Sequence, residues 1–249
     1  MEPAQQEWRK TGAKWAGTFL KLALFKLRQF ERVLFVDGDT LAVGPIHASW
    51  LHSHVQLSMD RPIAGSYDIS NSGNLRPKGG TRTFNSGVML IRPSLRQYER
   101  LIRALRSARA NRTRYLSEQP FLNAAFSVAR PFSSNFSLLP LSFAVNMAAF
   151  VVPSVWRRAL PLTVVHFTMN KPFGRGGLPA LRSARNGTGS CASKFQPLCE
   201  LWWDAEDRWL SDRRVLARVE ALERCSKQQV AAGGVGPISD KIRQPMYKL

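Results

Sequence analysis

The sequence has few cysteines and no long apolar run, and each shortage excludes a class of protein. Its three cysteines, Cys191, Cys199 and Cys225, are too few for a disulfide-stabilised scaffold, although one pair can form. They include no CxxC pair, so a zinc site is not expected. No apolar stretch approaches the roughly 18 residues that a membrane-spanning helix needs. The polar start over 1–14 does not have the pattern of a signal peptide.

Acidic residues are also scarce. The chain has 17 Asp and Glu against 36 Lys and Arg, which gives a formal net charge of +19. Such an excess favours polyanionic partners, such as nucleic acid, an anionic membrane or phosphorylated substrates. The basic residues are spread through apparent helices, and no nucleic-acid-binding motif accompanies them. We interpret the charge as a solvated, arginine-rich surface and keep nucleic-acid binding as a less favoured alternative.

What is present is enough apolar material for a core, arranged as alternating strands and helices. Apolar residues are 44% of the 249 residues and aromatic residues 10%. Short apolar runs predict buried strands over 33–36, 88–91 and 162–167, the first of them covered on both faces in a parallel sheet. Helical spacing predicts helices over 14–30, from Ser94 onward, over 117–126 and over 201–222. This alternation indicates an α/β fold.

We expect one domain over 15–225, with a polar segment over 1–14 before it and a disordered tail over 226–249 after it. Three sequons begin at Asn111, Asn135 and Asn186, but they carry glycans only in a secretory lumen. The sequence therefore leaves the cytoplasm and the Golgi both open as compartments.

Two aspartates follow the first predicted strand. Asp37 and Asp39 can meet one ion only if the chain turns at Gly38, which has the backbone freedom to do so. Carboxylate oxygens suit Mn²⁺ or Mg²⁺, and such an ion assists a departing diphosphate. An ordinary Asp-Gly turn is the alternative interpretation. His166 ends another predicted strand; as a ligand it would favour Mn²⁺ over Mg²⁺, and otherwise it is a hydrogen-bonded structural residue.

Polar residues elsewhere are candidates for binding a sugar donor. Asn85 and Ser86 lie in TFNSGV, which we interpret as a turn before a strand, and their side chains can bind sugar hydroxyls. Glu118 and Gln119 begin a predicted helix, where they can bind a sugar or act on a developing positive charge. Lys171 adds positive charge for a leaving diphosphate. Each of these signals is weak by itself.

Their order, however, resembles a known family. The motifs are a Lys-Leu pair before LFVDGDTL, then TFNSGVMLIRPS, SEQPFLNAAF, VVHF followed by KPF, and ELWW. This series resembles the glycogenin, galactinol synthase and plant glucuronosyltransferase family, which is family eight of the glycosyltransferases. The resemblance implies a Rossmann-like GT-A fold, with a mixed and mainly parallel sheet flanked by helices. It also implies retaining, metal-dependent transfer of a hexosyl group from a UDP-sugar to a hydroxyl acceptor.

Residue roles follow from the resemblance by position. It implies that Asp37, Asp39 and His166 bind Mn²⁺, and that Glu118 and Gln119 take the catalytic positions. The resemblance also implies that the sugar donor contacts Asp37 and Asp39, together with Lys21, Gly38, Asp60, Asn85, Ser86, Gln119 and Lys171. It places Lys171 at the diphosphate.

The sequence also departs from the family. About 20 residues precede Lys21, where the family has a strand, a Thr-Asn-x-x-Tyr segment and a further βα unit. We therefore expect an N-terminally incomplete fold. Phe173 replaces a Trp and Met169 a Gly, and the segment 146–156 has no Tyr, so self-glucosylation is not expected. A catalytically inactive remnant or binding module of the same fold is the alternative function.

Overall fold

The structure is a computed structural model, and it describes residues 16–69, 83–111, 115, 117–126, 135–168, 172 and 195–210. The chain divides into two compact units, Met1–His166 and Phe167–Leu249, where the sequence predicted one domain. The predicted domain ends near residues 15 and 225 lie outside the described residues. Within those residues, no helix is both long and apolar enough to cross a bilayer.

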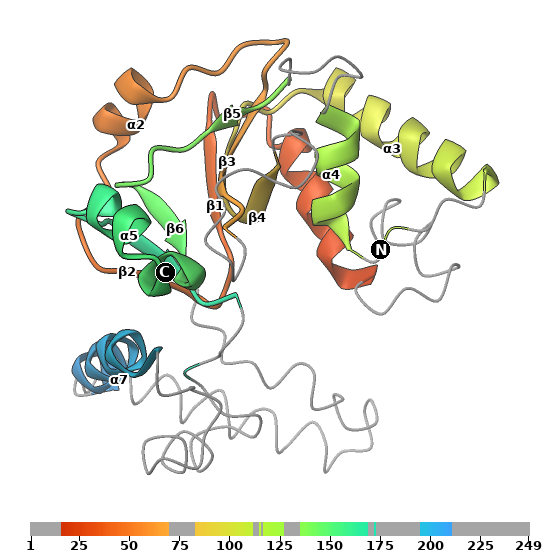
Figure 1. The fold of residues 1–249 in the computed structure, drawn as a ribbon. Helices are drawn as coiled ribbons and strands as arrows, with labels where there is room; N and C mark the ends of the chain where they lie inside the picture. Colours follow the sequence, from red (N-terminus) through yellow and green to blue (C-terminus); the bar gives the residue numbers. More distant parts are fainter. Residues whose placement is uncertain are drawn as a thin grey trace, which may run out of the picture. The chain divides into compact units, whose positions relative to one another are not determined.

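The first unit is built on a seven-stranded sheet (Figure 1). Its strands are β1 (Val33–Val36), β2 (Thr40–Ala42), β3 (Ile63–Tyr67), β4 (Phe84–Ile91), β5 (Ser137–Leu138), β6 (Ala144–Asn146) and β7 (Val164–His166). The order is β1-β4-β3-β6-β7-β2, and β5 pairs with β3. β3–β5, β3–β6 and β6–β7 are parallel, whereas β1–β4, β3–β4 and β2–β7 are antiparallel. The sheet is mixed, as expected, but these pairings divide evenly and are not mainly parallel.

The first predicted strand has the expected residues but a different neighbourhood. β1 ends the strand path and pairs with β4 in antiparallel register, Val33 with Ile91 and Val36 with Val88. It is only half-buried, and Val36 is 42% exposed. The expectation of a strand buried in a parallel sheet was therefore wrong, because a run of four apolar residues carries no information on strand direction or on which neighbours cover it.

The Asp-Gly-Asp segment joins the two ends of the strand path. β1 ends at Val36 and β2, at the opposite end of the path, begins at Thr40. The four Cα steps between them reach at most about 14 Å, whereas five strand spacings in a flat sheet amount to about 24 Å. The sheet must therefore curl, and the curl brings the ends of β1, β4 and β7 together around residues 37–39.

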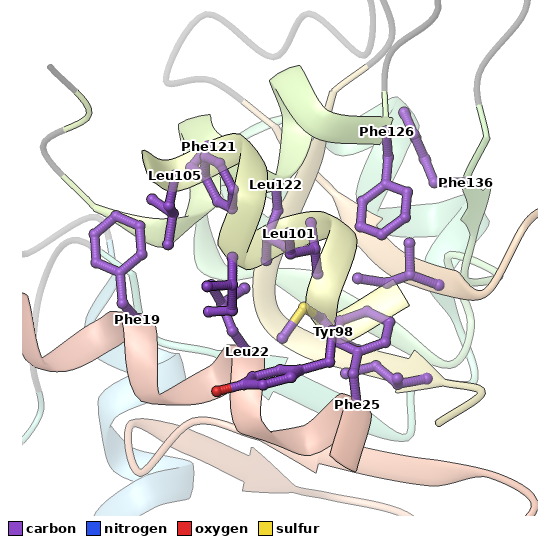
Figure 2. Close-up of a cluster of buried hydrophobic side chains, with 14 of the residues drawn as sticks. Phe19, Leu22, Phe25, Tyr98, Leu101, Leu105, Phe121, Leu122, Phe126 and Phe136 are labelled. Carbon is purple, nitrogen blue, oxygen red and sulfur yellow. The ribbon is translucent and has the colours of Figure 1, made fainter. Parts of the chain in front are cut away.

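Helices cover both faces of this sheet. On one face lie η1 (Ala16–Lys26), a 3-10 helix, with α3 (Leu95–Ala110) and α4 (Glu118–Phe126), and on the other lies α2 (Ala48–His54). β4 alternates between the two cores: Met89 and Ile91 join the first, and Val88 and Leu90 join the second. Figure 2 shows the first core, where side chains from η1, α3 and α4 interdigitate: Phe19, Leu22, Phe25, Tyr98, Leu101, Leu105, Phe121, Leu122 and Phe126.

The predicted helices form with adjusted ends. The helix predicted over 14–30 is described as η1, and the one predicted over 117–126 is α4. Ser94 caps α3 by accepting a hydrogen bond from Gln97 N at 3.4 Å, but the Gln97 side chain donates to Met59 O at 3.2 Å, so the reciprocal half of a capping box does not form.

Short elements complete both units. η2 (Met147–Val151) and α5 (Pro153–Ala159) follow β6 in the first unit. In the second unit α7 (Gln196–Leu210) begins five residues before the predicted helix of 201–222, whose C-terminal part lies outside the described residues. Within this unit Trp203 Nε1 donates to Pro172 O at 2.8 Å, and Cys199 is in a disulfide, in keeping with the one pair that the cysteine count allows.

Candidate metal-binding site

Asp37 and Asp39 are placed by the strands on either side of them. Asp37 N donates to Gly87 O at 2.7 Å, which extends the β1–β4 ladder by one bond. Asp39 precedes Thr40, which pairs with His166 across β2 and β7. Gly38, between them, is exposed, has no positive φ and would have open space around a Cβ atom. The turn therefore does not depend on glycine, although the sequence suggested that it would.

The side chains of Asp37, Asp39 and His166 converge. His166 Nε2 lies 3.1 Å from Asp39 Oδ1 and 3.9 Å from Asp37 Oδ2. One donor atom from each of the three lies within 4.8 Å of the others. The side chain of His166 is 7% exposed, that of Asp39 16% and that of Asp37 28%. Two carboxylate oxygens and an imidazole nitrogen are a suitable donor set for a divalent cation.

The protonation of His166 makes this fit stronger. Burial lowers the pKa of His166 to about 4, an effect that the charge of Asp37 opposes, so the imidazole is neutral near pH 7. Its Nδ1 lies 2.8 Å from Asn85 Oδ1, which also accepts a hydrogen bond from Gly87 N at 2.9 Å. Because Asn85 Oδ1 can only accept, Nδ1 carries the proton and Nε2 presents a lone pair to Asp39 Oδ1. Two acceptors thus face each other at 3.1 Å, an arrangement that a cation between them would stabilise.

An irregularity in β4 brings Asn85, Ser86 and Gly87 into the site. β3 pairs Gly65 with Met89, but the next residue, Ser66, pairs with Asn85, so residues 86–88 have no partner on β3. Bulges of this kind re-aim side chains next to functional sites. The predicted turn at 85–87 was therefore wrong. These residues belong to strand β4, and they form the bulge in it.

Gly87 is needed for the approach of His166. A Cβ atom on Gly87 would lie 1.9 Å from His166 Cε1 and 2.1 Å from its Nδ1. The imidazole therefore rests directly against the β4 backbone, which only glycine permits here.

Lys21, Asp37, Glu118 and Ser86 form the neighbouring part of the site. Lys21 Nζ lies 2.8 Å from Asp37 Oδ2, 2.7 Å from Glu118 Oε1 and 3.3 Å from Ser86 O. An ammonium group has three protons, so these three acceptors saturate it. In this state Lys21 acts as a counter-ion within the protein, whereas the resemblance placed it against the donor.

Glu118 is held just as firmly. Its side chain is 3% exposed, and its Oε1 also accepts a hydrogen bond from Ser86 Oγ at 2.8 Å. Burial by itself raises the pKa of Glu118, but the charge of Lys21 and hydrogen bonds from Lys21, Thr18 and Ser86 outweigh it, so the pKa is lowered. Glu118 is therefore an ionised, buried carboxylate, and contact with a substrate would require these bonds to rearrange.

Asp68 is a site residue that the sequence analysis missed. Gln119 Oε1 accepts from Ser86 N at 3.0 Å, and Gln119 Nε2 donates to Asp68 Oδ2 at 3.3 Å. Asp68 also accepts a hydrogen bond from the Asn85 side chain; burial raises its pKa, and the bond to Asn85 and the charge of His166 oppose the rise. The hydrogen bonds and ion pairs thus form a connected network that runs from Asp37 through Lys21, Glu118, Ser86, Gln119, Asp68 and Asn85 to His166.

Neither a known protein family nor an individual curated protein matches this sequence. Solved structures do resemble it. The galactosyltransferase LgtC, solved in complex with donor and acceptor sugar analogs, aligns over 79% of this chain and 77% of its own, with a TM-score of 0.50 and 16% identity. The chain therefore has a GT-A glycosyltransferase fold.

Two further structures align less closely. The bifunctional glycosyltransferase WbbM aligns over 69% of this chain and 37% of its own, with a TM-score of 0.46 and 16% identity. The glycosyltransferase GlyE of Streptococcus pneumoniae aligns over 76% of this chain and 47% of its own, with a TM-score of 0.43 and 18% identity.

Other predicted site residues lie elsewhere in the GT-A fold. Asp60 is exposed and precedes β3 at Ile63, whereas the site lies at the other end of that strand, at Ser66 and Asp68. Lys171 lies outside the described residues.

The charges of the site favour a cation. Four carboxylates, those of Asp37, Asp39, Asp68 and Glu118, lie in or beside this network with one ammonium group, that of Lys21, while His166 is neutral near pH 7. Like charges at this spacing repel, and a divalent ion offsets much of that repulsion. The Asp37, Asp39 and His166 group could thus bind a metal ion in this glycosyltransferase fold.

Proposed function

We propose that the protein is a metal-dependent glycosyltransferase that moves a hexosyl group from a UDP-sugar to a hydroxyl acceptor with retention of configuration. One observation carries this proposal: His166 Nε2 and Asp39 Oδ1 face each other as acceptors 3.1 Å apart, beside Asp37, in a GT-A fold. The ordered motifs that resemble the glycogenin and galactinol synthase family support the choice of a UDP-sugar and of Mn²⁺ over Mg²⁺.

In this proposal the protein residues bind and orient the reactants. Asp37, Asp39 and His166 hold the ion, which, when bound, neutralises charge on the departing diphosphate as a Lewis acid. The family resemblance implies that Lys171 adds positive charge at the diphosphate. Gln119 and Asp68 present polar groups at the end of β3, where sugar hydroxyls can replace the hydrogen bond between them. Lys21 keeps Asp37 in place and keeps Glu118 ionised.

A binding module of the same fold without catalysis is the second candidate. The observation that favours it is the engagement of Glu118, whose side chain is 3% exposed and paired with Lys21. A carboxylate held in this way serves structure, and it leaves Gln119, Asp68 and the metal ligands to do any chemistry.

A donor screen tests the proposal. UDP-glucose, UDP-galactose, UDP-glucuronate and UDP-xylose, labelled in the sugar, are incubated with the protein and Mn²⁺, and released sugar or glycosylated acceptor is measured. We expect metal-dependent turnover of one donor, lost in Asp39→Asn. Glu99→Gln, which removes an exposed carboxylate on α3, is the matched control and should retain activity.

Binding is measured separately from turnover. We expect Mn²⁺ together with UDP to raise the melting temperature of the wild type, since a ligand that binds only the native state stabilises it. Binding without turnover of any donor would favour the non-catalytic module. A wild-type protein that shows no thermal shift with Mn²⁺ and UDP would contradict both candidates.

A further inference from the structure

The amide of Asn85 bonds to the protein around it through both its oxygen and its nitrogen. The residue is 6% exposed. Its Oδ1 accepts from Gly87 N at 2.9 Å and lies 2.8 Å from His166 Nδ1, and its Nδ2 donates to the carboxylate of Asp68. The backbone donor on one side and the carboxylate on the other fix which end of the amide faces which neighbour. None of these groups belongs to a substrate.

This orientation determines what His166 can offer. With Asn85 Oδ1 as the acceptor, Nδ1 of the imidazole holds the proton, and Nε2 presents its lone pair toward Asp39 and Asp37. The opposite tautomer would place a proton where a metal ion must bind. The second nitrogen of a metal-binding His sets both the tautomer and the ring orientation in this way.

The backbone of β4 holds the ring from a second side. A Cβ atom at Gly87 would lie 1.9 Å from His166 Cε1, so the ring has no freedom to move toward the strand. Asn85 and Gly87 both belong to the bulged part of β4, and the Gly87 N–H joins them through Asn85 Oδ1. The bulge and Asn85 together fix the position and the orientation of the imidazole ring.

We propose that Asn85 is a positioning residue of the metal site: through His166 Nδ1 it selects the tautomer and the ring orientation in which Nε2 binds a divalent ion. This inference rests on the proposed function for the presence of the ion. It assigns Asn85 a role different from the sugar contact that the family resemblance implies. Loss of such an outer partner weakens metal affinity by about 10–100-fold.

The experiment measures Mn²⁺ affinity without any sugar nucleotide, so that contacts to a donor cannot contribute. Electron paramagnetic resonance of free Mn²⁺ gives the dissociation constant of the wild type, Asn85→Leu and Asn85→Asp. Leucine is similar in size but has no acceptor, and we expect its dissociation constant to rise by about 10-fold or more. Aspartate keeps an acceptor for Nδ1 but loses the donor to Asp68, so we expect Asn85→Asp to lose clearly less affinity than Asn85→Leu.

Asn123→Ala is the matched control. Asn123 is also a buried asparagine, on α4; its side chain accepts from Phe84 N and donates to Phe84 O, both at 2.8 Å, and makes no bond to His166. We expect it to lower the melting temperature and to leave Mn²⁺ affinity within about twofold. Nitrogen-15 spectra of the imidazole should show Nδ1–H for His166 in the wild type and a mixture of tautomers in Asn85→Leu.

The outcomes separate this inference from the function on which it rests. Wild-type affinity in Asn85→Leu, or an equal loss in Asn123→Ala, would overturn the positioning role while leaving the metal site intact. Failure of the wild type to bind Mn²⁺ would overturn the metal site and the positioning role together.

Discussion

Replacement of Lys21 by methionine tests the ionic part of the site most directly. Methionine keeps an unbranched chain of similar length but leaves Asp37, Glu118 and Ser86 O without the ammonium that lies 2.7–3.3 Å from them. The cost should come chiefly from Glu118, whose side chain is 3% exposed, because removal of one partner of a buried ion pair costs about 3–5 kcal/mol. Asp37 is 28% exposed and should add at most about 1 kcal/mol.

The assay is urea denaturation followed by circular dichroism. With an m-value near 3 kcal/mol/M, a loss of this size lowers the transition midpoint by about 1 M or more. The double variant Lys21→Met with Glu118→Gln should recover most of the loss, because the amide is neutral and can still accept the bond from Ser86 Oγ. A single variant within about 1 kcal/mol of wild type, or a double variant that recovers nothing, would refute this account of Glu118.

Three further predictions follow from other parts of the first unit. Gly87→Ala should abolish Mn²⁺ binding because its methyl group meets the His166 ring, whereas Gly38→Ala, with open space around it, should retain affinity within about twofold; calorimetric titration checks both. In the metal-free protein, the pKa of His166 is about 4 against 6.5 when unfolded, so stability should fall by up to about 3 kcal/mol as pH drops from about 6.5 toward 4. This dependence should be missing in His166→Gln, and pH-dependent denaturation curves that coincide for the two proteins would contradict it. Phe126→Ala should lower the free energy of unfolding by about 3–5 kcal/mol, measured by urea denaturation, because this fully buried ring stacks on Phe25 and lies under the guanidinium group of Arg100. A loss below about 1 kcal/mol would contradict this prediction.

The sequence was sufficient to predict which residues form the metal group and where most of the strands and helices lie. Apolar runs located β1, β4 and β7, and the order of motifs indicated that Asp37, Asp39 and His166 belong together, as the structure places them. These features are local or follow from strand ends meeting at one edge of a sheet. The direction of β1 and the even division of strand pairs are not local, because they depend on the curl of the whole sheet.

The polar neighbours of the metal group were harder to predict. The sequence analysis named Asp60, which precedes β3, and did not name Asp68, which directly follows the same strand and lies beside the metal group. The rule that ligands gather where strands end could have found it. The burial of Glu118 and the saturation of Lys21 could not be predicted, since they arise from η1, β4 and α4 packing against one another over about 100 residues of chain.

The bulge in β4 links assembly of the sheet to assembly of the site. Regular pairing after Gly65 would place Val88 opposite Ser66, and three residues would then shift along the strand. Such a sheet could still bury its apolar residues, but Asn85 and Gly87 would no longer meet His166. A chain that folds with β4 in the wrong register would therefore be compact but unable to bind the ion. Metal affinity thus reports correct strand alignment more sensitively than compactness does, and deletions within 86–88 should separate the two.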